Sequence, residues 1–228
     1  MNSIDVLGNG YVRLVDHMGS DLSIANAARA SFAKESTSFN ESDERLIAFL
    51  AREGHTSPFR HAFATFEFKA PLFVARQHWK YIVGSDHTMD GWNESSRRYI
   101  TMEPEFYIPE PHQWRTAPEN KKQGSGEPID ATKGVFLTDM LRDFIQSGED
   151  LYEMMINEYN IAPEQARLFL PAYAMHVVYR WSASLQSIAL FLNQRLDHDA
   201  QYEIQLYALA VKELITPEYP VSFKYLIS

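Results

Sequence analysis

Apolar and polar side chains alternate between residues 61 and 69. The apolar side of this alternation consists of Ala62, Ala64, Phe66 and Phe68. A period of two is typical of a strand with one buried face, so we expect a half-buried strand here. A second long strand is predicted over residues 174–182, which are rich in β-branched and aromatic types.

Apolar residues recur every three or four positions elsewhere, which predicts amphipathic helices. Ser42 is a suitable N-cap and Gly54 a suitable stop for a helix over about residues 42–53. Pro71 suits the first turn of a helix over residues 72–81 that ends near Gly84. A long helix is predicted with one apolar stripe, formed by Leu137, Met140, Leu141 and Phe144. A short helix is predicted from Pro163 to before Pro171, and helical patterning resumes from Leu185 to Leu214.

Two polar stretches, residues 85–92 and 115–134, are predicted loops, and the second could act as a substrate lid. We find no internal repeat. The pattern predicts one α+β domain over residues 1–228, with a few long strands covered by amphipathic helices.

Composition supports a folded protein. Hydrophobic types make up 45% of the 228 residues, enough for one sizeable core. No apolar run reaches the roughly 18 residues that span a membrane. The N-terminus lacks a basic stretch followed by an apolar one, so we expect no secretory signal, no membrane attachment and a cytoplasmic location.

Net charge and cysteine content exclude some classes of partner and of active site. The net charge is −9, which argues against a nucleic-acid partner, and an anionic ligand would need a local cluster of cations. The chain has no cysteine, which excludes disulfides, thiolate metal sites and a cysteine nucleophile.

Cationic side chains gather in four segments that also carry apolar residues, and they are Arg76, Lys80, Arg97, Arg98, Arg167 and Arg195. Arginine binds phosphate and uracil-like edges through two parallel hydrogen bonds, so an anion pocket is one interpretation. Surface ion pairs are the plainer interpretation for any one of them. Arg195 follows the apolar turn Phe191-Leu192-Asn193, where a cation needs a ligand or an ion pair with Asp197 or Asp199.

Other site types have weaker support. Possible metal ligands are His55, His61, Asp86, His87, Asp90, His198 and Asp199, but their spacing matches no standard pattern, so we expect no metal. Phe63, Phe66, Phe68, Phe73 and Trp79 are more consistent with a core than with a cofactor site. The chain has no glycine motif of the Walker or Rossmann type.

Six segments together resemble the flavin-dependent thymidylate synthases, in the order of that family and over nearly the whole chain. They are AARASF (27–32), GHTSPFRH (54–61), FKAPLFVARQ (68–77), NESSRRY (93–99), ARLFLP (166–171) and FLNQRLDHDAQYEIQ (191–205). The resemblance implies antiparallel strands and FAD-dependent transfer of a one-carbon unit from methylenetetrahydrofolate to dUMP. The product would be dTMP, NADPH would be the reductant, and a homotetramer would share its active sites between subunits. The absence of cysteine agrees, because flavin chemistry needs no thiolate nucleophile.

The resemblance also implies roles for individual residues. Those matching dUMP-binding positions are Gln77, Glu94, Ser96, Arg98, Arg167 and Arg195. Those at or beside FAD contacts are Ser31, His55, Ser57, Lys80, Tyr81, Glu94 and Asn193. Arg195 would be catalytic, because it would stabilise negative charge that develops on the uracil ring.

The chain departs from the family pattern in three places. The gap from Ile82 to Ser96 is longer than in the family, through an apparent insertion around residues 85–92. Lys80-Tyr81-Ile82 stands where the family signature has Arg-His-Arg. Ser184, Gln186 and Leu190 stand where Asn, Arg and Asn are common. Three alternatives therefore stay open: a related pyrimidine-nucleotide hydroxymethylase, a non-catalytic nucleotide-binding relative, and a metal-dependent hydrolase that uses the histidines.

Overall fold

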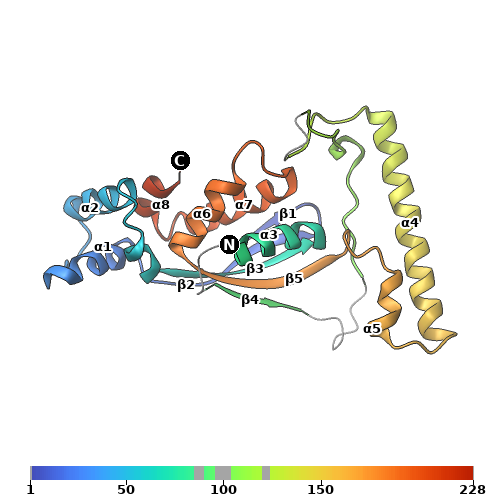
Figure 1. The fold of residues 1–228 in the computed structure, drawn as a ribbon, viewed down its shortest axis with the longest axis horizontal. Helices are drawn as coiled ribbons and strands as arrows, with labels where there is room; N and C mark the ends of the chain where they lie inside the picture. The colour runs from blue at the N-terminus through green and yellow to red at the C-terminus, as the bar shows by residue number, and fades with distance from the viewer. Residues whose placement is uncertain (1, 85–89, 96–103, 120–123, 228) are drawn as a thin grey trace.

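The computed structural model describes residues 2–84, 90–95, 104–119 and 124–227. Within them, one antiparallel sheet has the strand order β1-β2-β3-β5-β4 (Figure 1). Its strands are β1 (Ser3–Val6), β2 (Gly10–Met18), β3 (Phe63–Pro71), β4 (Gly91–Glu94) and β5 (His176–Ser184). The two strands predicted from the sequence are thus β3 and β5, which pair with each other along their whole length.

Helices cover one face of the sheet and extend beyond both of its ends (Figure 1). They are α1 (Asp21–Arg29), α2 (Glu41–Arg52), α3 (Leu72–Gly84), α4 (Ala131–Asn157), α5 (Pro163–Ala166), α6 (Leu185–Arg195), α7 (Tyr202–Ile215) and α8 (Pro220–Leu226). Short 3-10 turns are η1 (Ala30–Phe32), η2 (Ser57–His61), η3 (Pro111–Gln113) and η4 (Arg167–Phe169). The predicted α+β class, with antiparallel strands under helices, is confirmed. Among the described residues, no helix has the length and apolar character that crossing a bilayer requires.

The sequence patterns missed or misplaced some elements. Strands β1 and β2 and helices α1 and α8 were not predicted. The predicted 85–92 loop is wrong at its end, because Gly91 and Trp92 begin β4 by pairing with β5, and residues 85–89 lie outside the described part. The helical pattern from 185 to 214 is broken between α6 and α7 by a turn containing the exposed residues 197–199.

The core lies between the sheet and helices α3, α6 and α7. Phe66 and Phe68 are fully buried, as their place on the apolar face of β3 predicts, and Phe63, Phe73 and Trp79 are partly buried. On the opposite face, the carboxylate of Glu67 accepts hydrogen bonds from Tyr11, Arg13 and Arg180, at 3.0, 2.8 and 3.0 Å. The alternation in β3 therefore separates an aromatic face from a charged one.

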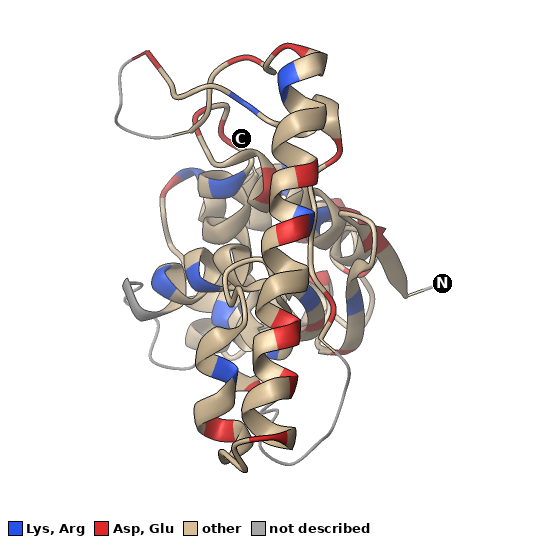
Figure 2. Cartoon of the chain, turned by 90° about the vertical axis from the view of Figure 1, so that its right-hand side faces the viewer, with Lys and Arg blue, Asp and Glu red and all other residues tan. Residues whose placement is uncertain are grey.

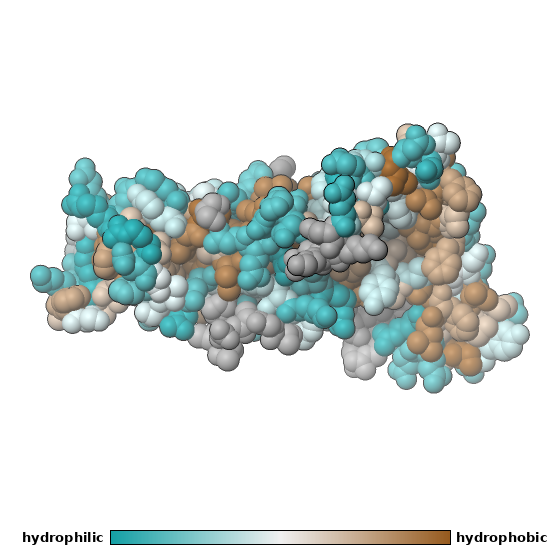
Figure 3. Space-filling model, turned by 45° about the horizontal axis from the view of Figure 1, so that its top comes forward, coloured by the Kyte–Doolittle hydropathy of each residue, from teal (hydrophilic) through white to brown (hydrophobic). Residues whose placement is uncertain are grey.

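Helix α4 buries mostly small residues and exposes several large apolar ones. Gly134, Thr138, Ile145 and Gly148 are its buried positions. The exposed apolar face of α4, as we call it below, consists of Val135, Phe136, Met140, Phe144 and Leu151. Figure 3 shows apolar side chains gathered at this end of the molecule, and Figure 2 shows acidic positions along the same helix. The stripe predicted for this helix is therefore only partly buried within one chain.

Gly134 should be needed for α4 to pack against the segment before it. A Cβ atom at this position would overlap the carbonyl oxygen of Pro111. In an open helix, alanine is preferred to glycine by about 1 kcal/mol, but overpacking costs about 1–3 kcal/mol. We expect Gly134→Ala to lower the free energy of unfolding in urea titrations, whereas Lys133→Ala, at an exposed neighbour, should not. A Gly134→Ala protein as stable as the wild type would contradict this packing.

Candidate active site

Arg195, at the end of α6, is a cation without a protein counter-ion in the described part of the chain. Its Nε atom is buried and has no hydrogen-bond partner among those residues, and burial lowers the pKa of the guanidinium. The ion pair with Asp197 or Asp199 that was the alternative is not formed there. Asp197 instead pairs with His198, with 2.6 Å between Oδ1 and Nδ1. Arg195 is therefore left for a ligand.

Helix α3 places three side chains, those of Gln77, His78 and Tyr81, near α6. The Oε1 atom of Gln77 is buried without a partner in the described residues. His78 is fully buried, and burial, followed by the nearby charge of Arg195, lowers its pKa to about 3. One turn after Gln77, the Tyr81 hydroxyl donates a 2.7 Å hydrogen bond to the carbonyl of Ser187 in α6. The His78 ring is therefore neutral near neutral pH.

Asp90 connects the start of β4 to this region. Its carboxylate accepts hydrogen bonds from the Trp181 indole at 3.1 Å and from the Ser187 hydroxyl at 2.9 Å. Burial raises the pKa of Tyr81 far above its ordinary value, and the charge of Asp90 adds to that effect. Asp90, considered from the sequence as a metal ligand, is a structural acceptor between β5 and α6.

A cleft of about 200 Å³ lies where β4 ends beside β5. It is lined by Glu94, Ser95, Arg167, Leu170, Met175, His176 and Val177. Burial of the Glu94 carboxyl raises its pKa, although the residue lies at the exposed rim and Trp92 and Arg76 act in the opposite direction. Arg167 is exposed, and its Nε donates to the Glu164 carbonyl at 3.2 Å. Two residues matched to dUMP contacts are therefore brought together here.

The residues matched to flavin contacts are more dispersed. Ser31 in η1, His55 after α2 and Ser57 in η2 are all exposed at the end of the molecule formed by α1 and α2. Figure 1 places this end opposite α5 and the adjoining Arg167. Lys80 is exposed on α3, and the Asn193 amide donates to the Leu226 carbonyl at 2.8 Å. Ser96 and Arg98 lie outside the described residues.

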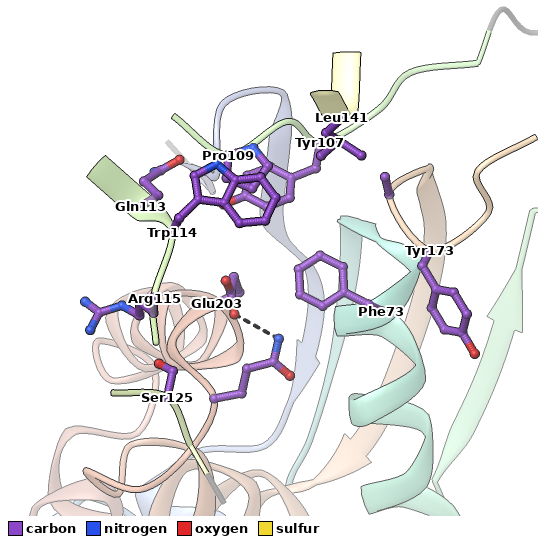
Figure 4. Close-up of a pocket in the computed structure, with 12 residues that line it drawn as sticks. Phe73, Tyr107, Pro109, Gln113, Trp114, Arg115, Ser125, Leu141, Tyr173 and Glu203 are labelled. Carbon is purple, nitrogen blue, oxygen red and sulfur yellow. Dashed lines mark hydrogen bonds between the residues drawn. The ribbon is translucent and has the colours of Figure 1, made fainter. Parts of the chain in front are cut away.

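A second cavity, of about 430 Å³, was not foreseen from the sequence (Figure 4). Its aromatic walls are Phe73, Tyr107, Trp114 and Tyr173, and polar groups from Gln113, Arg115, Gln201 and Glu203 also line it. The Gln201 amide donates to the Glu203 carboxylate at 2.8 Å. Such walls suit a planar ring, but no residue that the resemblance matched to a ligand lines this cavity. Among the described residues, no three His, Asp or Glu side chains are grouped as metal ligands would be.

Comparison with known proteins identifies the family. The family model described as "Thymidylate synthase complementing protein" (Thy1) matches residues 13–221. A flavin-dependent thymidylate synthase of Thermosipho africanus is 36% identical over 219 residues, covering 96% of this chain and 91% of the relative. One of Wolbachia pipientis is 37% identical over 220 residues, covering 96% of this chain and 74% of the relative. The chain belongs to the flavin-dependent thymidylate synthase family.

Solved structures agree with this assignment. The UMP/dUMP methylase PolB from Streptomyces cacaoi, bound with 5-Br dUMP, superposes with a TM-score of 0.81 at 26% identity, covering 95% of this chain and 93% of PolB. The structure of PolB with 5-Br UMP has a TM-score of 0.80 at 24% identity, covers 96% of each chain and supports the fold.

Membership of the family implies an enzyme of the methyltransferase class with a flavin cofactor. The residues present fit such a ligand. Buried polar atoms without a partner in the described part of the chain occur on Gln77, Gln186 and Arg195, all on α3 and α6. Isoalloxazine and pyrimidine edges carry both donors and acceptors, so they can pair with such atoms.

Removing the acceptor at Asp90 should destabilise the site. Asp90→Ala leaves the indole N–H of the fully buried Trp181 and the hydroxyl of Ser187 without their acceptor. We expect a loss of roughly 2–3 kcal/mol in unfolding free energy, measured by urea titration followed by tryptophan fluorescence. Asp90→Asn keeps one acceptor oxygen and should lose less. Equal stability of Asp90→Ala and wild type would contradict the assigned role.

Proposed function

We propose that this protein makes dTMP by transferring a one-carbon unit from methylenetetrahydrofolate to dUMP, with FAD as cofactor and NADPH as reductant. The observation that carries the proposal is the buried Nε of Arg195, which has no partner among the described residues, in a chain that matches the family over residues 13–221. The bound flavin supplies the hydride. The protein supplies binding, orientation and electrostatic stabilisation.

Each residue has a distinct task in this proposal. Arg195 faces the pyrimidine and stabilises negative charge as the C4 oxygen gains it, because a partly buried cation acts strongly on charge that appears during reaction. Gln77 and Glu94 orient the nucleotide, and Arg167 anchors it. His78, which is fully buried, stays neutral near the charge of Arg195. With no cysteine in the chain, thiolate addition to the pyrimidine is excluded.

The proposal is tested by assaying purified protein with dUMP, methylenetetrahydrofolate and NADPH. We expect a flavin absorption spectrum, formation of dTMP, and no loss of activity after thiol alkylation. Formation of the hydroxymethyl nucleotide would favour the related hydroxymethylase. Binding of dUMP without turnover would favour a non-catalytic relative, and a colourless protein with stoichiometric metal would favour a hydrolase. Turnover without flavin or reductant would also rule the proposal out.

The distribution of the matched residues supports a homotetramer with shared active sites. The segment that follows α2 carries the flavin-matched His55 and Ser57 and lies at the opposite end of the molecule from α5, which the dUMP-matched Arg167 follows directly, so one chain does not gather these positions into one site (Figure 1). The exposed apolar face of α4 offers a surface for a second copy, because large outward aromatics are characteristic of buried interfaces. We also retain the sequence-based predictions of one domain over residues 1–228, a cytoplasmic location and no nucleic-acid partner.

Charge placed on the exposed apolar face of α4 should break the assembly. Phe136 and Phe144 are 64% and 61% exposed in one chain. We expect wild type to contain about four subunits by light scattering, and Phe136→Glu/Phe144→Glu to dissociate and lose flavin, because burying an unpaired carboxylate is costly. Lys133→Glu, which makes the same change in net charge at an exposed polar position on the same helix, is the control. A monomeric wild type that binds flavin would rule out shared sites.

Arg195 and Arg167 should differ in their kinetic effects. Charge develops on the ring during reaction, whereas the phosphate is charged throughout, so a group facing the ring affects kcat and an anchoring group affects KM. We expect Arg195→Ala to lower kcat by roughly 100-fold or more. Arg167→Ala should mainly weaken dUMP binding, by up to about 3 kcal/mol. Steady-state kinetics at matched flavin occupancy measure kcat and KM for both variants. A normal kcat for Arg195→Ala would show that Arg195 does not act on the pyrimidine ring.

A further inference from the structure

His176 is deeply buried, and its ring forms no hydrogen bond of good geometry within the described part of the chain, although the Glu105 backbone is near enough to act on the pKa of the ring. Only 6% of the residue is exposed, and neither Nδ1 nor Nε2 has a hydrogen-bond partner among the described residues. The same side chain lines the 200 Å³ cleft that Glu94 and Arg167 also line. A buried polar atom without a partner costs free energy, so such atoms in native proteins usually meet a ligand or water.

The backbone of His176 is held in place by its neighbours. Its own N–H donates to the Glu105 carbonyl at 2.8 Å, and it is paired with Pro71 in the β3–β5 register. The preceding Met175 forms a β-bridge with Phe106. Three segments therefore meet at this residue, which fixes its backbone beside the cleft.

The charge state of the ring narrows what it can bind. Burial lowers the pKa of His176, so the ring is neutral at neutral pH. The adjacent charges compensate one another, because Lys69 and Glu105 form a salt bridge of 2.6 Å. A neutral imidazole has one donor and one acceptor. A sugar hydroxyl and the amide edge of a pyrimidine each carry a donor and an acceptor as well, so they match this ring. A phosphate matches it less well, because a phosphate only accepts hydrogen bonds.

We propose that His176 is a further substrate-binding residue, which hydrogen-bonds the nucleoside part of dUMP in the cleft between Glu94 and Arg167. This inference rests on the proposed function. The resemblance assigned no role to position 176, and the sequence alone placed it inside an apolar strand. The ring contacts the nucleoside, and Arg167 supplies the positive charge of the same cleft.

The test compares substitutions at His176 in the flavin-loaded protein by calorimetric titration with dUMP. His176→Leu keeps a similar volume without polar atoms and should raise the Kd roughly 10-fold, as for one lost hydrogen bond. His176→Gln restores a donor and an acceptor and should recover part of the affinity. Val178→Ile, a conservative apolar change in the same strand outside the cleft, should leave the Kd within about 2-fold of wild type.

Two further readouts separate substrate binding from a structural role. Without nucleotide, the urea midpoint of His176→Leu should equal or exceed that of wild type, because two buried unpaired atoms have been removed. His176→Leu should lose affinity for deoxyuridine, which lacks the phosphate, by the same factor as for dUMP. Unchanged dUMP affinity, a lowered urea midpoint, or a loss seen with dUMP but not with deoxyuridine would each overturn the proposal. Failure of the wild type to bind dUMP would instead refute the proposed function.

Discussion

One column of stacked rings determines where the helices sit on the sheet. Phe68 of β3 stacks on Tyr179 of β5 with 5.0 Å between ring centroids, and Trp92 of β4 stacks on the same tyrosine at 4.0 Å. Aromatic pairs of this kind contribute about 0.5–1.5 kcal/mol beyond the burial of their area. The column therefore joins three strands through side chains as well as through the backbone ladder.

His78 packs the helices against this column of rings. Its ring lies 4.6 Å from both Trp181 and Phe191 by centroid distance, and its Nδ1 is 3.1 Å from the Tyr179 hydroxyl. One imidazole on α3 thus touches β5 and α6 together. Because Gln77 precedes it and Arg195 ends α6, the packing of this ring determines how the polar groups of the site are arranged.

The fold could be predicted where local patterns match tertiary burial. The alternation in β3 was informative because one of its faces meets helices and the other carries Glu67 and its cationic partners. Strand β4 was not predictable, because its four residues, Gly91–Glu94, are held by pairing with a strand far along the chain. The same holds for α8, whose first turn is fixed by the buried carboxylate of Asp21.

The site divides in the same way. Motif order pointed to Arg195 and Arg167, because those motifs are local in sequence. Whether Arg195 is paired depends on how Asp197 turns at the end of α6, which no local pattern reveals. A binding role for His176 could not be predicted for the same reason. A single histidine in an apolar strand has the sequence pattern of a core residue, and only the structure shows that its ring nitrogens lack partners among the described residues.

The unpaired buried atoms on α3, α6 and β5 have a consequence for the lifetime of the protein in a cell. Each one makes the ligand-free fold less stable than its packing alone would allow. A ligand that pairs them returns that free energy, so the folded population rises with the concentrations of nucleotide and flavin. Because proteases remove the unfolded fraction, we expect the ligand-bound protein to be degraded more slowly than the ligand-free protein.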